Sequence, residues 1–244
     1  MSAYLDRYFA AAENILRGIR EQERASIEEA GRMVAGSLAE GGIWSVYDTG
    51  HLLQHEAHIR AGGLIALTHF GFELVVDHPT LRPDTGEQAP GDLTAREIAV
   101  ALDRSRLREA DVLLINSNSG RTANVIELAL QCRERGIRTI GLFSRAQMTR
   151  SEAAHATGKK LDAVVDLGID NHSPYGDAMV SVQGPDAMCP ASGWSSAIVL
   201  WAIQAQAVAL LEERGLTPAI YRSVHVSGQA YIDQQVEHYR RNGL

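Results

Sequence analysis

The sequence has only two cysteines, Cys132 and Cys189, in 244 residues. Two cysteines cannot supply the disulfide framework on which many small secreted domains depend. Cys132 falls on the apolar side of a predicted helix, where a thiol packs as a small hydrophobic side chain. We therefore expect a fold held by its hydrophobic core, for which an apolar share of 45% is ample.

Long hydrophobic segments and an excess of positive charge are also lacking. The longest apolar stretch, 197–211, is interrupted by Gln204 and Gln206 and is shorter than the roughly 20 residues that span a bilayer. The first residues include Asp6 and Arg7 and lack the basic-then-apolar order of a signal peptide. Because the formal net charge is −7, we expect no nucleic acid and no membrane as partner. These features favour a cytoplasmic protein.

A strand–loop–helix–strand unit stands out in the middle of the chain. Residues 112–115 are an unbroken apolar run, typical of a strand buried on both faces of a parallel sheet. Five small or polar residues follow, and from Thr122 to Gly136 the apolar residues recur at helical spacing. Residues 137–143 predict the next strand. Such a crossover between parallel strands is nearly always right-handed.

The loop at 116–122 has the composition of an anion site. A helix N-terminus presents unpaired N–H groups and a partial positive charge. Ser117, Ser119 and Thr122 add hydroxyl donors, and Gly120 allows a ligand to approach the backbone closely. A helix cap needs one such residue. Three hydroxyls and two asparagines therefore favour phosphate binding over simple capping.

The hexapeptide at 117–122, Ser-Asn-Ser-Gly-Arg-Thr, resembles the Ser-x-Ser-Gly-x-Thr signature of sugar isomerase (SIS) domains. In that family the signature binds the phosphate of phosphosugars. The resemblance covers roughly residues 24–214 and is greatest to the phosphoheptose-isomerase-like branch. It implies that the substrate phosphate is held by Ser117, Asn118, Ser119, Gly120 and Thr122.

The alternation of apolar strands and amphipathic helices predicts a three-layer α/β/α sandwich with a five-stranded parallel sheet, the SIS fold. Strands are predicted at 43–47, 64–68, 112–115, 137–143 and 163–167, and 181–190 is predicted as a loop. The chain, 1–244, is predicted as one SIS domain with N-terminal helices, about 1–40, and a C-terminal helical tail, about 217–244.

The turn after the first predicted strand supplies the candidate catalytic residues. In phosphoheptose isomerases the helix after this turn carries a catalytic glutamate, and the resemblance assigns that role to Glu56, at a shorter spacing. Those enzymes have a serine in the turn, and here His51 lies near its place. Aldose–ketose isomerisation needs a base that moves a proton between adjacent carbons, and groups that stabilise the enediolate. Glu56 and His51 supply a carboxylate and an imidazole.

Three residues are predicted to contact the substrate: Thr49, Gly50 and Ser192. A loop histidine, His172, is interpreted as a surface residue. The resemblance implies a phosphorylated sugar as partner, and three classes of function remain open. The chain is a phosphosugar isomerase, a phosphosugar lyase that eliminates an ether, or a module that senses phosphosugars without converting them.

No cofactor is expected, although the histidines near Glu56 leave zinc open. His55 and His58 are three residues apart and can share a helix face, and zinc accepts imidazole and carboxylate ligands. The sequence lacks the His-Glu-x-x-His signature.

An apolar stripe runs along the predicted N-terminal helix from Tyr4 to Ile19. This helix precedes the sheet and has no sheet of its own to cover. Packing against a second subunit would bury the stripe, and SIS relatives commonly form dimers or tetramers. We expect a homodimer or homotetramer.

Overall fold

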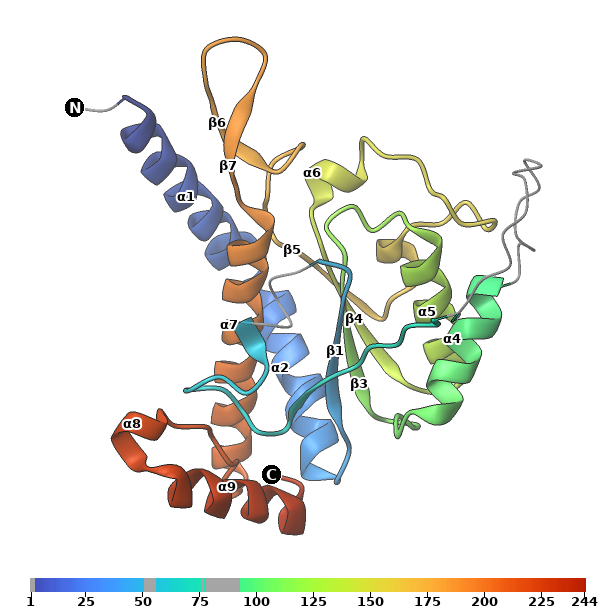
Figure 1. Ribbon diagram of the computed structural model, residues 1–244, viewed down its shortest axis with the longest axis vertical. Helices are drawn as coiled ribbons and strands as arrows, with labels where there is room; N and C mark the ends of the chain where they lie inside the picture. Colours follow the sequence, from blue (N-terminus) through green and yellow to red (C-terminus); the bar gives the residue numbers. More distant parts are fainter. Residues whose placement is uncertain (1–2, 51–55, 76, 78–92) are drawn as a thin grey trace.

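A five-stranded parallel sheet lies at the centre of the computed structural model, which describes residues 3–50, 56–75, 77 and 93–244 (Figure 1). The strand order is β2-β1-β3-β4-β5, and each neighbouring pair is parallel. The strands are β1 (Trp44–Asp48), β2 (Leu67–His69), β3 (Val112–Asn116), β4 (Arg138–Phe143) and β5 (Leu167–Asp170).

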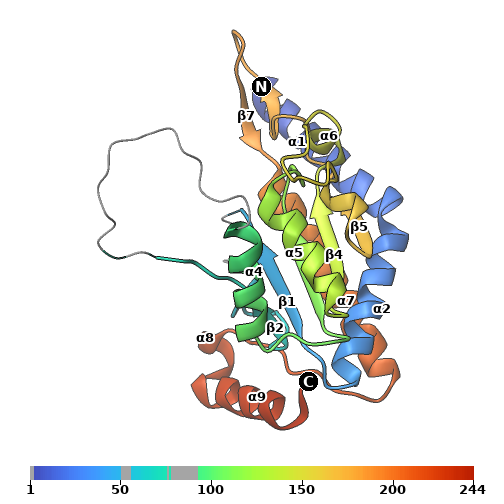
Figure 2. The ribbon, with the colours of Figure 1, turned by 90° about the vertical axis from the view of Figure 1, so that its right-hand side faces the viewer.

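Helices cover both faces of the sheet, so the predicted three-layer sandwich is confirmed (Figure 2). One layer consists of α1 (Ala3–Gln22), α2 (Arg24–Ala39) and α7 (Ser192–Glu213). The other consists of α4 (Leu93–Arg104) and α5 (Ala123–Glu134). The short helices α6 (Arg145–Met148) and η1 (Leu161–Ala163) follow β4, and the tail forms α8 (Val224–Ser227) and α9 (Gln229–Asn242).

The central strand shows why the apolar run at 112–115 marks the middle of the sheet. Side chains of a strand point alternately to its two faces. Val112 and Leu114 pack into the core beneath α2 and α7, whereas Leu113 and Ile115 pack into the core beneath α4 and α5. All four side chains are fully buried. A strand that needs apolar residues on both faces has no polar alternation.

The longest helix, α7, is part of the core. By length and composition, an 18-residue stretch of α7 is apolar enough to cross a membrane. Half of that stretch is buried inside the molecule. Val199, Leu200 and Ile203 lie in the core cluster that α2 also enters. The apolar length of α7 is thus explained by packing, and a cytoplasmic location stays a prediction.

Three sequence-based element assignments are wrong. The second strand begins at Leu67, not at Leu64, and Leu64 instead forms an isolated bridge with Ile220. The fifth strand begins at Leu167, not at Ala163, because residues 161–163 form a 3₁₀ turn that buries Leu161 and, just after it, Val164. The predicted loop at 181–190 is part of an antiparallel hairpin of β6 (Ala178–Ser181) and β7 (Ala187–Pro190), which projects beside α1 (Figure 1).

Candidate functional site

A cavity of about 760 Å³ opens at the carboxyl ends of the strands. The order β2-β1-β3 means that the chain leaves β1 toward one edge of the sheet and later returns to start β3 on its other side. In open α/β sheets this reversal point is where ligands bind. The cavity is lined from five places: Asp48, Thr49 and Gly50; Asn116, Ser117, Asn118, Ser119, Thr122 and Asn124; Gln147; Gly176 and Asp177; Pro190, Ser192, Gly193, Trp194 and Ser196.

Hydrogen bonds join the loops that follow β1 and β3. The amide of Asn116 donates to Asp48 Oδ1 over 2.7 Å, and the backbone N–H of Gly50 donates to the same oxygen over 2.8 Å. Thr49 donates to the Asn116 carbonyl from its backbone N–H and from its hydroxyl. Thr49 and Gly50 are therefore held against the base of the predicted phosphate loop.

The hydroxyls of that loop have no partner among the residues that the structure describes. Thr122 is the N-cap residue of α5, yet its side chain makes no capping bond. Within the described part of the chain, the Ser117 and Ser119 side chains are not engaged in hydrogen bonds either. The first N–H groups of any α-helix also lack partners inside that helix. Three hydroxyl groups and the start of α5 are thus available to one ligand.

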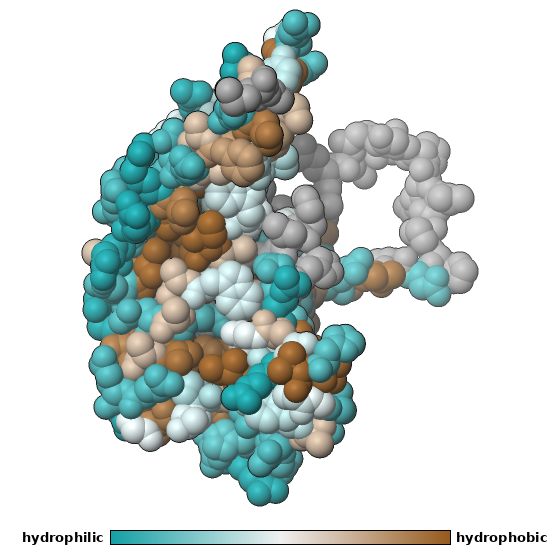
Figure 3. All heavy atoms as spheres, turned by 90° about the vertical axis from the view of Figure 1, so that its left-hand side faces the viewer, coloured by the Kyte–Doolittle hydropathy of each residue, from teal (hydrophilic) through white to brown (hydrophobic). Residues whose placement is uncertain are grey.

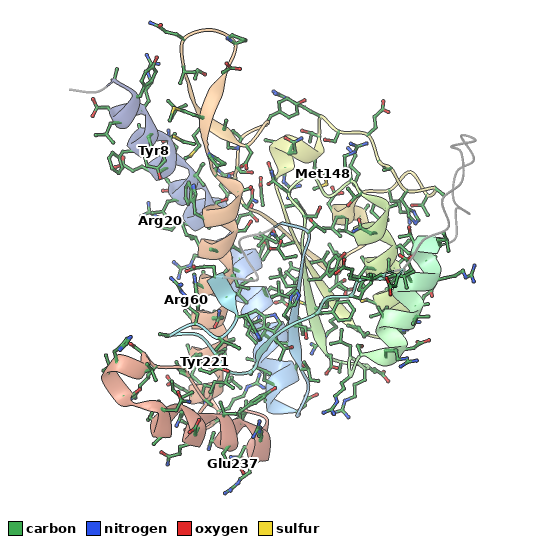
Figure 4. All side chains as sticks on the ribbon, in the orientation of Figure 1. Tyr8, Arg20, Arg60, Met148, Tyr221 and Glu237 are labelled. Atoms are coloured by element: carbon green, nitrogen blue, oxygen red, sulfur yellow. The ribbon has the colours of Figure 1, made fainter. Side chains whose placement is uncertain are left out.

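Gly120 gives this loop its shape. Its φ is +55°, in the left-handed region that residues with a Cβ avoid. A Cβ there would lie 3.2 Å from Leu161 Cβ and 3.4 Å from the sulfur of Met148, the residue labelled in Figure 4. Gly120 therefore has a structural role as well as leaving the backbone accessible.

Asn118 anchors the loop to its neighbours. Its Oδ1 accepts hydrogen bonds from Asn171 Nδ2 at 3.1 Å and from the Ser173 hydroxyl at 2.9 Å. Its carbonyl accepts from the backbone N–H of Ser144, which follows β4. Among the described residues the Nδ2 group of Asn118 has no partner, so this side of the amide is left for a ligand.

The start of α7 forms the opposite wall of the cavity. Asp177 accepts from the backbone N–H groups of Ala191 and Ser192 with Oδ1, and from the Ser192 hydroxyl with Oδ2. Asp177 has a φ of +65°. A residue 14 positions upstream thus performs the capping that Ala191 cannot, and it fixes the predicted substrate contact Ser192.

The predicted base, Glu56, does not line this cavity. It makes an ion pair with Arg60 at 3.3 Å, and Arg60 lies on the α7 side of the molecule (Figure 4). Its role as a base stays a prediction. His51, the second candidate catalytic residue, falls outside the described residues. Of the described residues that line the cavity, Asp48 and Asp177 carry the carboxylates.

The part of the chain that the structure describes contains no cluster of residues that could bind zinc. No group of three or more histidine, cysteine, aspartate or glutamate residues there could hold a metal ion. His58 is exposed, and His55 falls outside the described residues. Zinc binding by His55 and His58 stays a hypothesis from the sequence.

Several cavity residues were not recognised in the sequence, among them Asp48, Asn124, Gln147, Asp177 and Trp194. Gln147 Oε1 accepts from the N–H of Gly176, and Asn124 donates to the Tyr47 hydroxyl. A signal was available for Asp48, since it ends the first strand of the parallel sheet, where open α/β sheets place their ligands. No pattern in the sequence predicts that Gln147 or Trp194 lines the cavity.

His172, interpreted as a surface residue, is largely buried beside the cavity loops. A Cβ on Gly18 would lie 2.7 Å from its Nδ1, and its Nε2 lies 3.6 Å from Glu23 Oε1. The nearby carboxylate raises the pKa of His172, against burial, which lowers it. Burial also raises the pKa of Glu23, but attraction to His172 and the N–H of Asp170 outweigh it, so the pKa of Glu23 lies below its usual value. This pair links the α1–α2 junction to the loop after β5.

Comparison with known proteins agrees with the fold. A model of the SIS domain matches residues 7–144. The chain belongs to the SIS domain family. Among curated relatives, the UPF0309 proteins of Streptomyces coelicolor and Streptomyces griseus are 33% and 34% identical to it, each over 91% of this chain and 89% of the relative.

Solved structures of SIS proteins share the architecture. The phosphoheptose isomerase from Neisseria gonorrhoeae matches with a TM-score of 0.51 and 16% identity, over 85% of this chain and 97% of that one. The phosphoheptose isomerase from Francisella tularensis also gives 0.51, with 14% identity, over 87% and 100%. At this identity the likeness establishes the fold.

Proposed function

We propose that this SIS protein binds a phosphorylated sugar in the cavity between the loops after β1 and β3, and that it interconverts the aldose and ketose forms. The observation that carries the proposal is the set of hydroxyls on Ser117, Ser119 and Thr122, which have no partner within the described residues and gather at the start of α5. Phosphate oxygens accept hydrogen bonds from such groups. The phosphosugar isomerases among the similar structures support this choice.

The remainder of the cavity suits the sugar. Asp48, Asn124, Gln147 and Ser192 bring carboxylate, amide and hydroxyl groups to its wall, and these can donate to or accept from the hydroxyls of a sugar. A volume of about 760 Å³ lies within the usual range for small-molecule sites. Phosphate at one loop and polar groups opposite would hold the sugar in one orientation.

Glu56 is the proposed base of the isomerisation. The lining carboxylates, Asp48 and Asp177, already accept several hydrogen bonds that hold the loops together. Glu56 is instead engaged in an ion pair with Arg60, in which the arginine side chain is 54% exposed and the glutamate side chain 30% exposed. Exposed pairs are worth about 0–1 kcal/mol, so releasing Glu56 toward a substrate would cost little. In this proposal the reaction needs no metal.

Glu56→Gln should therefore lower turnover by about 100-fold or more while phosphosugar affinity changes little. An amide cannot accept the proton, but it preserves shape and removes no phosphate contact. A panel of phosphosugars is first screened for conversion, and the variant is then compared with the wild type by product assay and titration calorimetry. Glu134→Gln, an exposed change in α5, is the control.

Full turnover in Glu56→Gln would end the role of Glu56 as base, and His51→Asn would be tested next. Binding without conversion of any phosphosugar would instead indicate the sensing function. Formation of an eliminated product would indicate the lyase. No binding of any phosphosugar would overturn the proposal.

A further inference from the structure

A second cavity, of about 610 Å³, lies at the β2 edge of the sheet. Its walls come from β1 and β2, from the segment after β2, from the end of α4 and from Tyr239 of α9. It shares no lining residue with the first cavity among those that the structure describes. It is therefore a separate site.

The charge of this second cavity is opposite to that of the protein. Arg104, Arg106 and His69 line it, and no aspartate or glutamate does so among the described residues. The whole chain carries a formal charge of −7. Within the described part of the chain, neither arginine has an ion-pair or hydrogen-bond partner. Arg104 lies in the last turn of α4, where a cation also favours the helix dipole, but Arg106 lies beyond the helix.

Aromatic rings form another part of the wall. Phe70, Phe72 and Tyr239 line the second cavity. Phe72 stacks on Tyr47 with ring centroids 5.9 Å apart and an interplanar angle of 14°, and Phe70 lies against both rings. Rings held in such a cluster present flat surfaces with little freedom to move, and flat ligand rings stack on such surfaces.

The backbone after β2 leaves room for the histidine at this wall. A Cβ added to Gly71 would lie 2.5 Å from His69 Nε2. The absence of a side chain at Gly71 is what allows the His69 imidazole to lie over it. Glycine at this position thus lets a hydrogen-bonding imidazole line the same cavity as the two arginines.

We propose that the second cavity binds a small phosphorylated ligand with a flat ring, of which a nucleoside monophosphate is the simplest example. Arginine binds phosphate through two parallel hydrogen bonds. Arg104 and Arg106 both line this cavity and have no partner within the described residues, so they are available to a phosphate group. The aromatic wall takes the ring. The first cavity is different, because no arginine, lysine or histidine lines it among the described residues.

The test is titration calorimetry of the full chain with AMP and UMP, beside adenosine and inorganic phosphate. We expect saturable binding of at least one nucleotide, and at least about tenfold weaker binding of adenosine, since phosphate–arginine hydrogen bonds are the stronger kind. The double variant Arg104→Gln with Arg106→Gln should lose at least about tenfold in affinity for that nucleotide. The control pair Arg133→Gln with Arg214→Gln should not.

Two more variants separate the cavities and the two parts of the ligand. Ser119→Ala, in the first cavity, should leave nucleotide affinity unchanged. Phe72→Leu should weaken nucleotide binding several-fold and leave inorganic phosphate unaffected, because only the ring contact is lost. The proposal is overturned if neither nucleotide binds at millimolar concentration, if the arginine pair is without effect, or if Ser119→Ala abolishes nucleotide binding as completely. Because phosphosugar binding is measured separately, a failure here leaves the proposed function untouched.

Discussion

At the residue scale, the hydroxyls of one loop decide whether the first cavity is a phosphate site. Ser119 is the clearest test, because its side chain lines the cavity and has no protein partner within the described residues. Loss of its hydroxyl therefore removes a contact to the ligand without removing one from the fold. Asn118 would be a poorer test, since its amide oxygen holds Asn171 and Ser173.

Ser119→Ala should weaken phosphosugar binding by about 1–2 kcal/mol, or roughly 5- to 30-fold, which is the scale of a hydrogen bond to a charged group. The melting temperature should stay within about a degree of the wild type. Titration calorimetry and a thermal melt measure both effects. Ser181→Ala, an exposed change in the hairpin, serves as the control. Unchanged affinity in Ser119→Ala would remove the basis of the phosphate assignment.

At the residue scale, the sequence predicted only part of the candidate site. The hydroxyls and Gly120 were recognisable because a contiguous hexapeptide carries them. Asp177 was not, because its role depends on Ser192, which is 15 residues away and becomes its neighbour only through the hairpin. His172 was misplaced for a similar reason. Its burial depends on Gly18, which leaves the space that the imidazole fills.

At the scale of elements, the ion pair between Glu23 and His172 joins the α1–α2 junction to the loop after β5. Asp170 is the other charged group that raises the pKa of His172, and Arg145 lowers it. The same loop holds the phosphate-loop residue Asn118 through Asn171 and Ser173. The protonation state of one imidazole can therefore affect how firmly helices and cavity loops are joined.

Because the pKa of His172 is raised in the folded state, its stabilising effect is complete below about pH 6.5, the ordinary histidine value. The effect is lost as the pH rises through the folded-state pKa. The lowered pKa of Glu23 works in the opposite direction, and its contribution is lost only as the pH falls below the ordinary carboxyl range. The pair should therefore stabilise most in weakly acidic solution.

His172→Asn removes the titrating group and keeps a residue type that tolerates the φ of +57° found there. We expect the wild type to exceed this variant in melting temperature by roughly 2–4 °C more at pH 6 than at pH 8.5, the shift that about 1 kcal/mol produces in a chain of this size. Thermal melts across this range measure it. Glu23→Gln should flatten the same profile. A difference that grows toward pH 8.5 would contradict the assigned coupling.

Elements with a strong apolar period were predicted well, and those shaped by tertiary packing were not. The strand at 112–115 and the helix after it follow from local pattern alone. The fifth strand was predicted to begin four residues too early. Leu161 and Val164 are apolar because they pack into the core beneath α5 from a 3₁₀ turn, and they are not part of a strand. The hairpin was missed since its segment is rich in turn formers and only Val180 is fully buried.

At the scale of the whole molecule, the two cavities are linked through one side chain. Tyr47 stacks on Phe72 of the second cavity, and its hydroxyl accepts a hydrogen bond from Asn124 of the first at 3.2 Å. Burial raises the pKa of Tyr47 above its usual value, so the phenol stays protonated. Tyr47 therefore contacts residues that line both cavities.

One face of the molecule remains incompletely covered. Leu5, Phe9 and Leu16 of α1 are 53%, 55% and 49% exposed. Trp201 and Ile198 of α7 are only partly buried. Figure 3 shows hydrophobic side chains gathered in patches over the side where α1 and α7 lie. A helix that is apolar on all sides, as α7 is, is normally covered on all sides, so a second copy of the chain is the expected cover.

We therefore predict a homodimer or homotetramer with α1 and the outer side of α7 in the interface. Light scattering after size exclusion should give a mass at least twice the 26.5 kDa of the chain at micromolar concentration. Phe9→Asp with Leu16→Asp should reduce it toward the monomer, because burying carboxylates without partners costs several kcal/mol each. Val100→Asp on α4 replaces an equally exposed apolar residue, 59% exposed, on the opposite layer, so it should leave the mass unchanged. Monomeric wild type would show that α1 has no partner copy, whereas an oligomer that persists in the double variant would move the interface to another face.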